Sequence, residues 1–157
     1  MQIESYGVSE ELNEDLTEKW INYKFNLTVK KVNDSFESFR FDLATKAIYE
    51  FIWYDFCDWY IEFSKSRFYG DDENDKIIAQ KVSLYVLETT LKLMHPYCPF
   101  ITEEIWSHFN DNKMLIHAEW PKSDEQIINS QIEDELSTIM KLSLIHISEP
   151  TRQAEIS

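Results

Sequence analysis

The sequence predicts an all-α fold, an antiparallel helical bundle with one short extended segment. Two observations predict it. The 157 residues include only two glycines and four prolines, too few for a sheet protein with many tight turns or for a glycine-rich phosphate-binding loop. Apolar residues recur at steps of three and four, as they do along one face of an α-helix. The apolar fraction of 43% and a length of about one domain suffice for a single hydrophobic core.

The first predicted helix spans residues 15–38. It follows a polar lead-in at residues 1–13, which has no periodicity and which we expect to be frayed. The apolar side chains of the helix fall on one face, with Lys24, Lys30 and Lys31 largely on others: Ile21, Phe25, Val29, Val32, Phe36 and Phe39.

The second predicted helix begins at Phe41 and runs to about Arg67. Asp42 is placed to cap its N-terminus or to interact favourably with the helix dipole there. Apolar residues cover an unusually wide arc of this helix, so we expect it to be the central and most buried one.

A third helix is predicted from Asp75 to Met94, after the acidic connection 71–75, and the prolines that follow end it. Thr102 is placed to cap a fourth helix that reaches about Phe109 and has acidic residues in its first turn. Residues 114–120 alternate between apolar and polar side chains and form the extended segment. The bundle is thus assigned to residues 14–121.

Residues 122–141 are expected to hold a linker and the start of a truncated C-terminal helix that begins near Ser130. The stretch from Leu142 to Arg152 resembles the translation of a sequencing adaptor, and Pro150 breaks any helix that reaches it. We therefore expect residues 142–157 to be an artefactual tail; a natural disordered tail is the alternative.

The net charge of −14 argues against a non-specific nucleic-acid binder, because phosphate neutralisation supplies most of the affinity of such proteins. The charges are unevenly distributed, however. Acidic residues concentrate at residues 10–18, 71–75 and 133–135, whereas six of the fifteen cations lie within one stretch: Lys19, Lys24, Lys30, Lys31, Arg40 and Lys46. This distribution allows a local cationic face on an acidic body.

The sequence offers no catalytic or metal-binding constellation. Asp55, Asp58 and Glu62 share a helical face, but with no histidine, lysine or metal ligand beside them they favour a structural role. The two cysteines, Cys57 and Cys98, have no partner at metal-ligand spacing and are expected to be free buried thiols. No apolar run is long enough for a membrane helix. We expect a cytoplasmic monomer with no metal, no cofactor of its own and no membrane contact.

Four segments, in this order and spacing, resemble the anticodon-binding domain of valine–tRNA ligases: Leu16–Ile21, Arg40–Asp42 with Tyr49–Glu62, Leu91–Trp106 and Ile116–Pro121. The resemblance covers about residues 12–141. The string Phe56-Cys57-Asp58-Trp59-Tyr60-Ile61-Glu62 is similar to the valine-type version. Isoleucine and leucine ligases share the same bundle and remain alternatives.

The resemblance implies that the chain binds the anticodon stem-loop of a valine tRNA as part of a larger synthetase. In that family, ATP-dependent charging and editing belong to upstream domains, so we expect this fragment to be inactive alone and to bind no ATP. Its partners would be the valine tRNA and the remainder of the synthetase.

The expected RNA contacts lie on the first helix. Lys19, Trp20, Tyr23 and Lys24 would form the contact surface, with Lys31 and Arg40 as further backbone contacts. Trp20 lies between two cations, as suits a ring that stacks on an unpaired base, although a ring closing the end of the bundle fits as well.

Two other interpretations remain open. An acidic helical module could bind a basic protein partner and have no role with RNA. A small enzyme could instead use Asp55, Asp58 and Glu62, provided that these carboxylates share a concave pocket.

Overall fold

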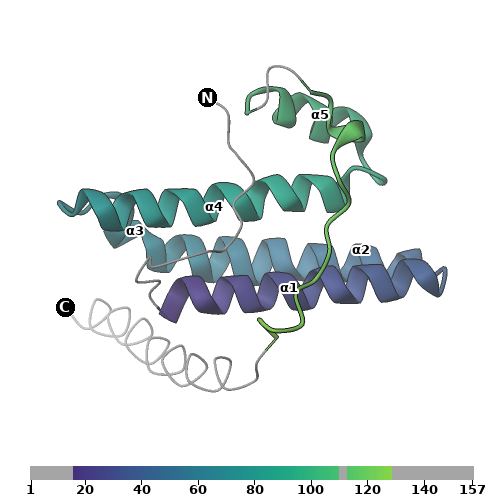
Figure 1. Ribbon diagram of the computed structural model, residues 1–157, viewed down its shortest axis with the longest axis horizontal. Helices are drawn as coiled ribbons and strands as arrows, with labels where there is room; N and C mark the ends of the chain where they lie inside the picture. Colours follow the sequence, from purple (N-terminus) through teal and green to yellow (C-terminus); the bar gives the residue numbers. More distant parts are fainter. Residues whose placement is uncertain (1–15, 110–112, 129–157) are drawn as a thin grey trace, which may run out of the picture.

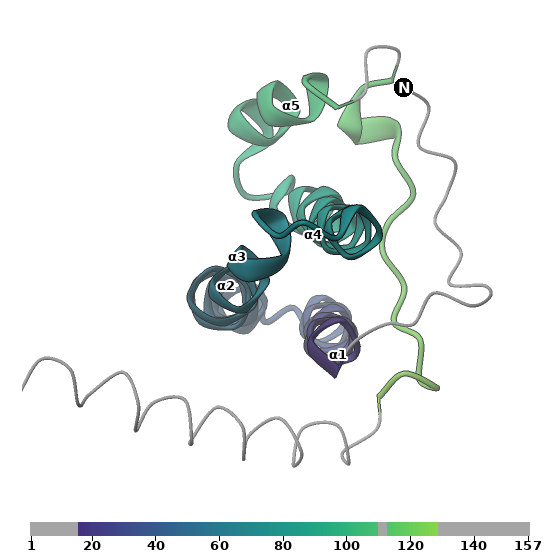
Figure 2. The same ribbon diagram turned by 90° about the vertical axis from the view of Figure 1, so that its left-hand side faces the viewer.

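The computed structural model describes residues 16–109 and 113–128 (Figure 1). The long elements are α1 (Leu16–Glu37), a composite second helix made of α2 (Phe41–Glu50), η1 (Phe51–Ile61) and α3 (Glu62–Phe68), and then α4 (Glu73–Met94). Each of these three rods runs antiparallel to the one before it, and end-on they are arranged as a triangle (Figure 2). The short helix α5 (Pro99–Ser107) and a single 3₁₀ turn, η2 (Leu115–His117), follow. The predicted all-α bundle is confirmed.

Three sequence predictions lie outside the described residues. They are the lead-in at residues 1–13, the helix expected near Ser130 and the tail at residues 142–157.

The composite second helix contains an eleven-residue π-helical middle, η1, in a rod that the sequence predicts as one α-helix. The backbone stays in the right-handed helical region at both joints, so the rod is continuous. In a π-helix, hydrogen bonds run from residue i to i+5, so side chains about five apart share a row. Phe51, Phe56 and Tyr60 form such a row, with stacked rings 6.5 Å and 5.9 Å apart.

The most buried helix is α1, and the expectation that the second helix would be is wrong. Buried side chains occur at ten positions along α1, and Ile21, Val29 and Val32 are fully enclosed. The second helix uses only part of its wide apolar arc for the core. The other part carries Tyr49, Trp53 and Tyr54 on the surface, each more than half exposed.

α1 is also covered by the segment after α5, residues 113–128, which we call the strap. Asn33 accepts a hydrogen bond from the indole nitrogen of Trp120 (2.7 Å) and donates one to the carbonyl of Pro121 (3.3 Å). Two turns earlier, Asn26 accepts a hydrogen bond from the backbone N–H of Asp124 (2.8 Å). The strap therefore crosses α1 on the side away from the second helix, as Figure 2 shows.

The strap contains the predicted extended segment, residues 114–120, with one difference. The backbone is extended at Met114 and Ala118, but the 3₁₀ turn η2 lies between them. The turn carries Leu115 into a small cluster with Leu91 and Trp106, and the Leu115 N–H donates to the Glu103 carboxylate (2.8 Å).

Asp42 lies in the first turn of α2, where its charge suits the helix dipole, which is one of its two predicted roles; its carboxylate pairs with Arg40, the N-cap residue. The predicted N-cap at Thr102 is wrong. Thr102 lies inside α5, which begins at Pro99 because proline fits the first helical position. The Thr102 hydroxyl is buried and lies 2.9 Å from Nδ1 of His95, which ties α5 to the end of α4. The helix α4 begins at Glu73, two residues earlier than predicted, because the Asp72 side chain caps it.

An ion triad joins α1, α3 and α4, in which Glu18 and Arg67 are buried and Asp75 is half-exposed. The guanidinium of Arg67 at the end of α3 donates to Glu18 of α1 and to Asp75 of α4, the latter at 2.7 Å. The Glu18 side chain is fully buried and that of Arg67 is 10% exposed. Because a buried carboxylate without a partner is very unfavourable, this triad fixes the relative position of three helices at one end of the bundle.

We predict that Arg67→Met lowers the free energy of unfolding by roughly 3–5 kcal/mol, because the Glu18 carboxylate is left buried without its cation. The double variant Glu18→Leu/Arg67→Met should recover most of that loss, since no buried charge remains. Urea unfolding followed by circular dichroism measures both values.

The control for this experiment is Lys65→Met. Lys65 lies two residues away and forms an exposed pair with Glu62 (2.5 Å). Its loss should cost less than about 1 kcal/mol. Equal effects of Arg67→Met and Lys65→Met would show that the triad does not hold the helices together.

The buried tyrosine Tyr60 should make stability fall at high pH. Burial, helped by the nearby Glu18 charge, raises the pKa of Tyr60 to about 12 from its ordinary value of 10.0. The folded chain then holds the phenolic proton more tightly than the unfolded chain. This contribution to stability is complete below about pH 10 and is lost as the pH rises toward 12.

We expect Tyr60→Phe to reduce the loss of unfolding free energy between about pH 9 and pH 11.5. The exposed Tyr49→Phe is the control and should leave that loss unchanged. An identical pH dependence in wild type and Tyr60→Phe would contradict the assignment.

Candidate RNA-binding surface

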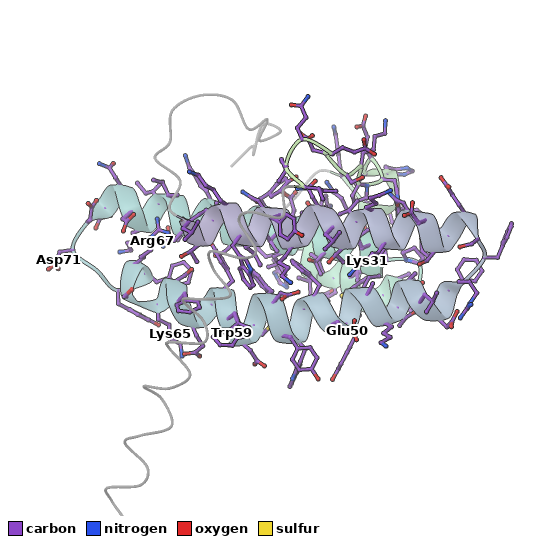
Figure 3. All side chains as sticks on the ribbon, turned by 90° about the horizontal axis from the view of Figure 1, so that it is seen from below. Lys31, Glu50, Trp59, Lys65, Arg67 and Asp71 are labelled. Atoms are coloured by element: carbon purple, nitrogen blue, oxygen red, sulfur yellow. The ribbon has the colours of Figure 1, made fainter. Side chains whose placement is uncertain are left out.

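The two ends of the bundle differ in charge. The turn between α3 and α4 forms one end, which we call the α3–α4 end. The turn between α1 and α2 forms the other, the α1–α2 end; Figure 3 shows Arg67 and Asp71 toward the first and Lys31 and Glu50 toward the second. Around the α3–α4 turn, residues 55–76 carry seven acidic and three basic side chains, to which α1 adds Glu18, Lys19 and Lys24. Around the α1–α2 turn, residues 30–50 carry four of each. A polyanion is therefore repelled less at the α1–α2 end.

Aromatic rings gather at the α1–α2 end around Phe36, the last large apolar residue of α1. Its ring centroid lies 5.6 Å from that of Phe41, 6.2 Å from that of Tyr97 and 5.4 Å from that of Trp120. The Tyr97 hydroxyl donates to the carbonyl of Phe41 (3.1 Å). We call these four rings the aromatic cluster. It joins α1, α2, the α4–α5 turn and the strap, and three of its rings reach solvent: Phe41, Tyr97 and Trp120.

Phe39 and Arg40 lie in the turn at the tip of this end. The Phe39 side chain is 80% exposed, and its backbone has φ of 56°, in the left-handed region. The Arg40 guanidinium donates from Nε and Nη2 to the two carboxylate oxygens of Asp42, at 2.9 Å and 2.8 Å. This pairing holds the pKa of Asp42 at about 2. Two of the five guanidinium N–H groups are used in these bonds, so Arg40 is held in place at an exposed position.

The predicted RNA-contact residues do not come together. Trp20 is 2% and Tyr23 5% exposed, and the Trp20 ring packs in the main core. Stacking on a base requires an accessible ring face, and neither ring offers one in this structure. They face inward because α1 is enclosed on several sides.

The four predicted cations divide between the two ends. Lys19 is exposed and Lys24 is half-buried, 3.9 Å from Asp55, and both lie in the part of α1 near the α3–α4 end. Lys31 is exposed in the other half of α1, and Arg40 lies at the α1–α2 tip. With a rise of about 1.5 Å per residue, Lys19 is on the order of 30 Å from that tip. One RNA loop cannot contact both groups closely.

Sequence reasoning missed Phe39, Tyr97 and Trp120 as surface residues. The helical period assigns Phe39 to the buried face of α1, but the helix ends two residues before it. The signal that could have revealed this site is the Phe39-Arg40-Phe41 sequence, an aromatic–basic–aromatic run between two helices.

The carboxylates of the enzyme interpretation form no common site. Asp55 pairs with Lys24, Glu62 pairs with Lys65, and Asp58 is exposed on the helix surface. Among residues 16–109 and 113–128, no group of three or more histidine, cysteine, aspartate or glutamate side chains is placed to hold a metal ion. No described helix is both long and apolar enough to cross a membrane. Cys57, expected to be buried, is exposed.

Comparison with known proteins places the chain in a family. Residues 18–154 match the family model described as the anticodon-binding domain of tRNA ligase. Similar proteins include the valine–tRNA ligases of Fusobacterium nucleatum (42% identity over 83% of this chain and 15% of the relative) and Latilactobacillus sakei (40%, over 92% and 16%). That of Staphylococcus saprophyticus is 34% identical over 98% of this chain and 17% of the relative.

The chain therefore spans about one sixth of the length of these relatives. The helical architecture and the family match agree, and they confirm the resemblance seen in the sequence. This chain belongs to the anticodon-binding domain family of tRNA ligases.

Proposed function

We propose that this chain is the anticodon-binding part of a valine–tRNA ligase and that it binds the anticodon stem-loop of a valine tRNA through its α1–α2 end. The observation that carries the proposal is the coincidence, at this one end, of accessible rings with a fixed arginine. The choice of valine rests on the relatives, which are valine–tRNA ligases at 34–42% identity.

The chemistry of this end suits an unpaired RNA loop. Bases that leave the helical stack can rest on aromatic rings, while cations meet the backbone phosphates. The aromatic cluster and Phe39 supply the rings. Arg40 and Lys31 supply cations for the phosphates, which fix the position of the loop; hydrogen bonds to base edges would read the sequence.

The acidic α3–α4 end has a complementary role in this proposal. Negative charge near the turn at residues 71–75 repels the phosphates and disfavours binding in the reversed orientation. An acidic protein can therefore bind RNA at one end. Lys19 and Lys24, at the α3–α4 end, are not part of the proposed contact.

The proposed parent enzyme is longer than this chain. In the proposed parent enzyme, other domains use ATP to attach valine to the tRNA, and this bundle serves as a monomeric arm that holds the anticodon in the cytoplasm. The chain would contribute affinity and tRNA selection but none of the reacting groups.

We predict that Arg40→Gln weakens binding of the full chain to a valine tRNA anticodon stem-loop and lowers the slope of log affinity against log salt by about 0.7–0.9, the value for one lost phosphate contact. Lys31→Gln should act in the same direction. Fluorescence anisotropy with a labelled stem-loop at two salt concentrations measures both.

Lys65→Gln is the matched control. Like Arg40, Lys65 is an exposed cation paired with an acidic side chain, but it lies near the α3–α4 end. It should leave affinity and slope unchanged. Equal losses from Arg40→Gln and Lys65→Gln would mean that only net charge matters. Equal affinity for valine, isoleucine and alanine stem-loops would contradict the proposed selectivity.

A further inference from the structure

The turn at the α1–α2 end has the hydrogen-bond pattern of a Schellman motif. The Arg40 N–H donates to the carbonyl of Ser35 (2.7 Å), and the Phe39 N–H donates to the carbonyl of Phe36 (3.1 Å). In this motif the residue in the position of Phe39 adopts the left-handed conformation, as Phe39 does with φ of 56°. Glycine usually occupies that position because a β-carbon is unfavourable there.

The phenylalanine side chain at this position contributes little to the packing of the fold. Its ring is 80% exposed, whereas the neighbouring Phe36 makes the contacts of the aromatic cluster. The chain thus places a large apolar side chain where glycine would be favoured and then leaves it in water. Residues that break a local rule without a structural gain tend to be functional.

We infer that Phe39 is the platform on which one unpaired base of a bound RNA loop stacks. This inference rests on the proposed function and names one further residue of the same surface. The left-handed turn leaves the ring exposed at the end of the bundle, and Arg40, the next residue, carries an exposed guanidinium.

The surroundings of Phe39 fit a nucleotide better than an apolar protein surface. Its neighbours along the chain are the exposed polar residues Ser38 and Arg40, and the half-exposed ring of Phe41 follows. An exposed ring next to a cation matches a nucleotide, which joins a flat base to a negative phosphate.

The test compares two properties of Phe39→Gly in the full chain. Glycine removes the ring and also relieves the left-handed residue, so the thermal midpoint of the free chain should stay the same or rise by a few degrees. Affinity for the valine tRNA anticodon stem-loop should fall roughly 5- to 150-fold, the range for one lost base–aromatic stack. Opposite changes in stability and affinity distinguish a binding role from a structural one.

Further variants test the stacking itself. Phe39→Trp keeps a flat ring and should bind within about threefold of wild type, whereas Phe39→Leu keeps apolar volume but should weaken binding like glycine. Tyr69→Ala is the matched control. Its ring is 86% exposed after the end of α3, at the α3–α4 end, and its removal should leave affinity unchanged.

The outcomes separate this inference from the proposed function. If wild type binds the stem-loop and Phe39→Gly binds equally well, Phe39 is not the platform, although the bundle still binds RNA. A lower thermal midpoint for Phe39→Gly, or a loss of affinity in Phe39→Trp as large as in Phe39→Gly, also overturns the inference. If wild type does not bind the stem-loop, the proposed function and the inference both fail.

Discussion

The burial of α1 constrains everything else in this structure. The second helix and α4 pack against it on one side, and the strap crosses it on another, held by Asn26 and Asn33. A helix covered in this way offers little of its length to a large ligand, so its ends become the places where it can take part in binding. This explains why cations spaced along α1 do not form a single surface.

The two ends of α1 are stabilised by different interactions and suit different roles. At the α3–α4 end, the Glu18–Arg67–Asp75 triad pairs two buried charges with a half-exposed carboxylate, which fixes geometry but leaves few groups for a ligand. At the α1–α2 end, rings from three other segments pack around Phe36, and these rings stay partly in water. Partly exposed rings beside an arginine are suited to binding unpaired RNA.

The sequence predicted the fold well because helical periodicity is a local signal. The bounds of α1 agree with prediction within one residue, and the composite second helix ends one residue beyond its predicted end. The relative burial of helices is not a local property: the wide apolar arc of the second helix predicts enclosure, but part of it carries exposed Trp53 and Tyr54. The hydrogen bonds between α1 and the strap join residues 87 to 98 positions apart, and no local pattern reveals them.

The candidate site was predicted only in part for the same reason. Arg40 and Lys31 belong both to the contacts predicted from the sequence and to the proposed surface, because charge is visible in the sequence. Trp20 is flanked by cations in the sequence, but its own ring points into the core. The role of Phe39 depends on a backbone conformation at a helix end, which a repeating pattern cannot show. The family resemblance supplied the function that local chemistry left open.

We propose that RNA contacts the α1–α2 end and not the flank of α1. Titration of the ¹⁵N-labelled full chain with a valine tRNA anticodon stem-loop, followed through the backbone amide signals by nuclear magnetic resonance, distinguishes the two surfaces. We expect the largest shifts at residues 36–42, 95–98 and 118–121. Largest shifts at residues 16–24 and 62–76 would contradict this proposal and would place the RNA at the acidic end.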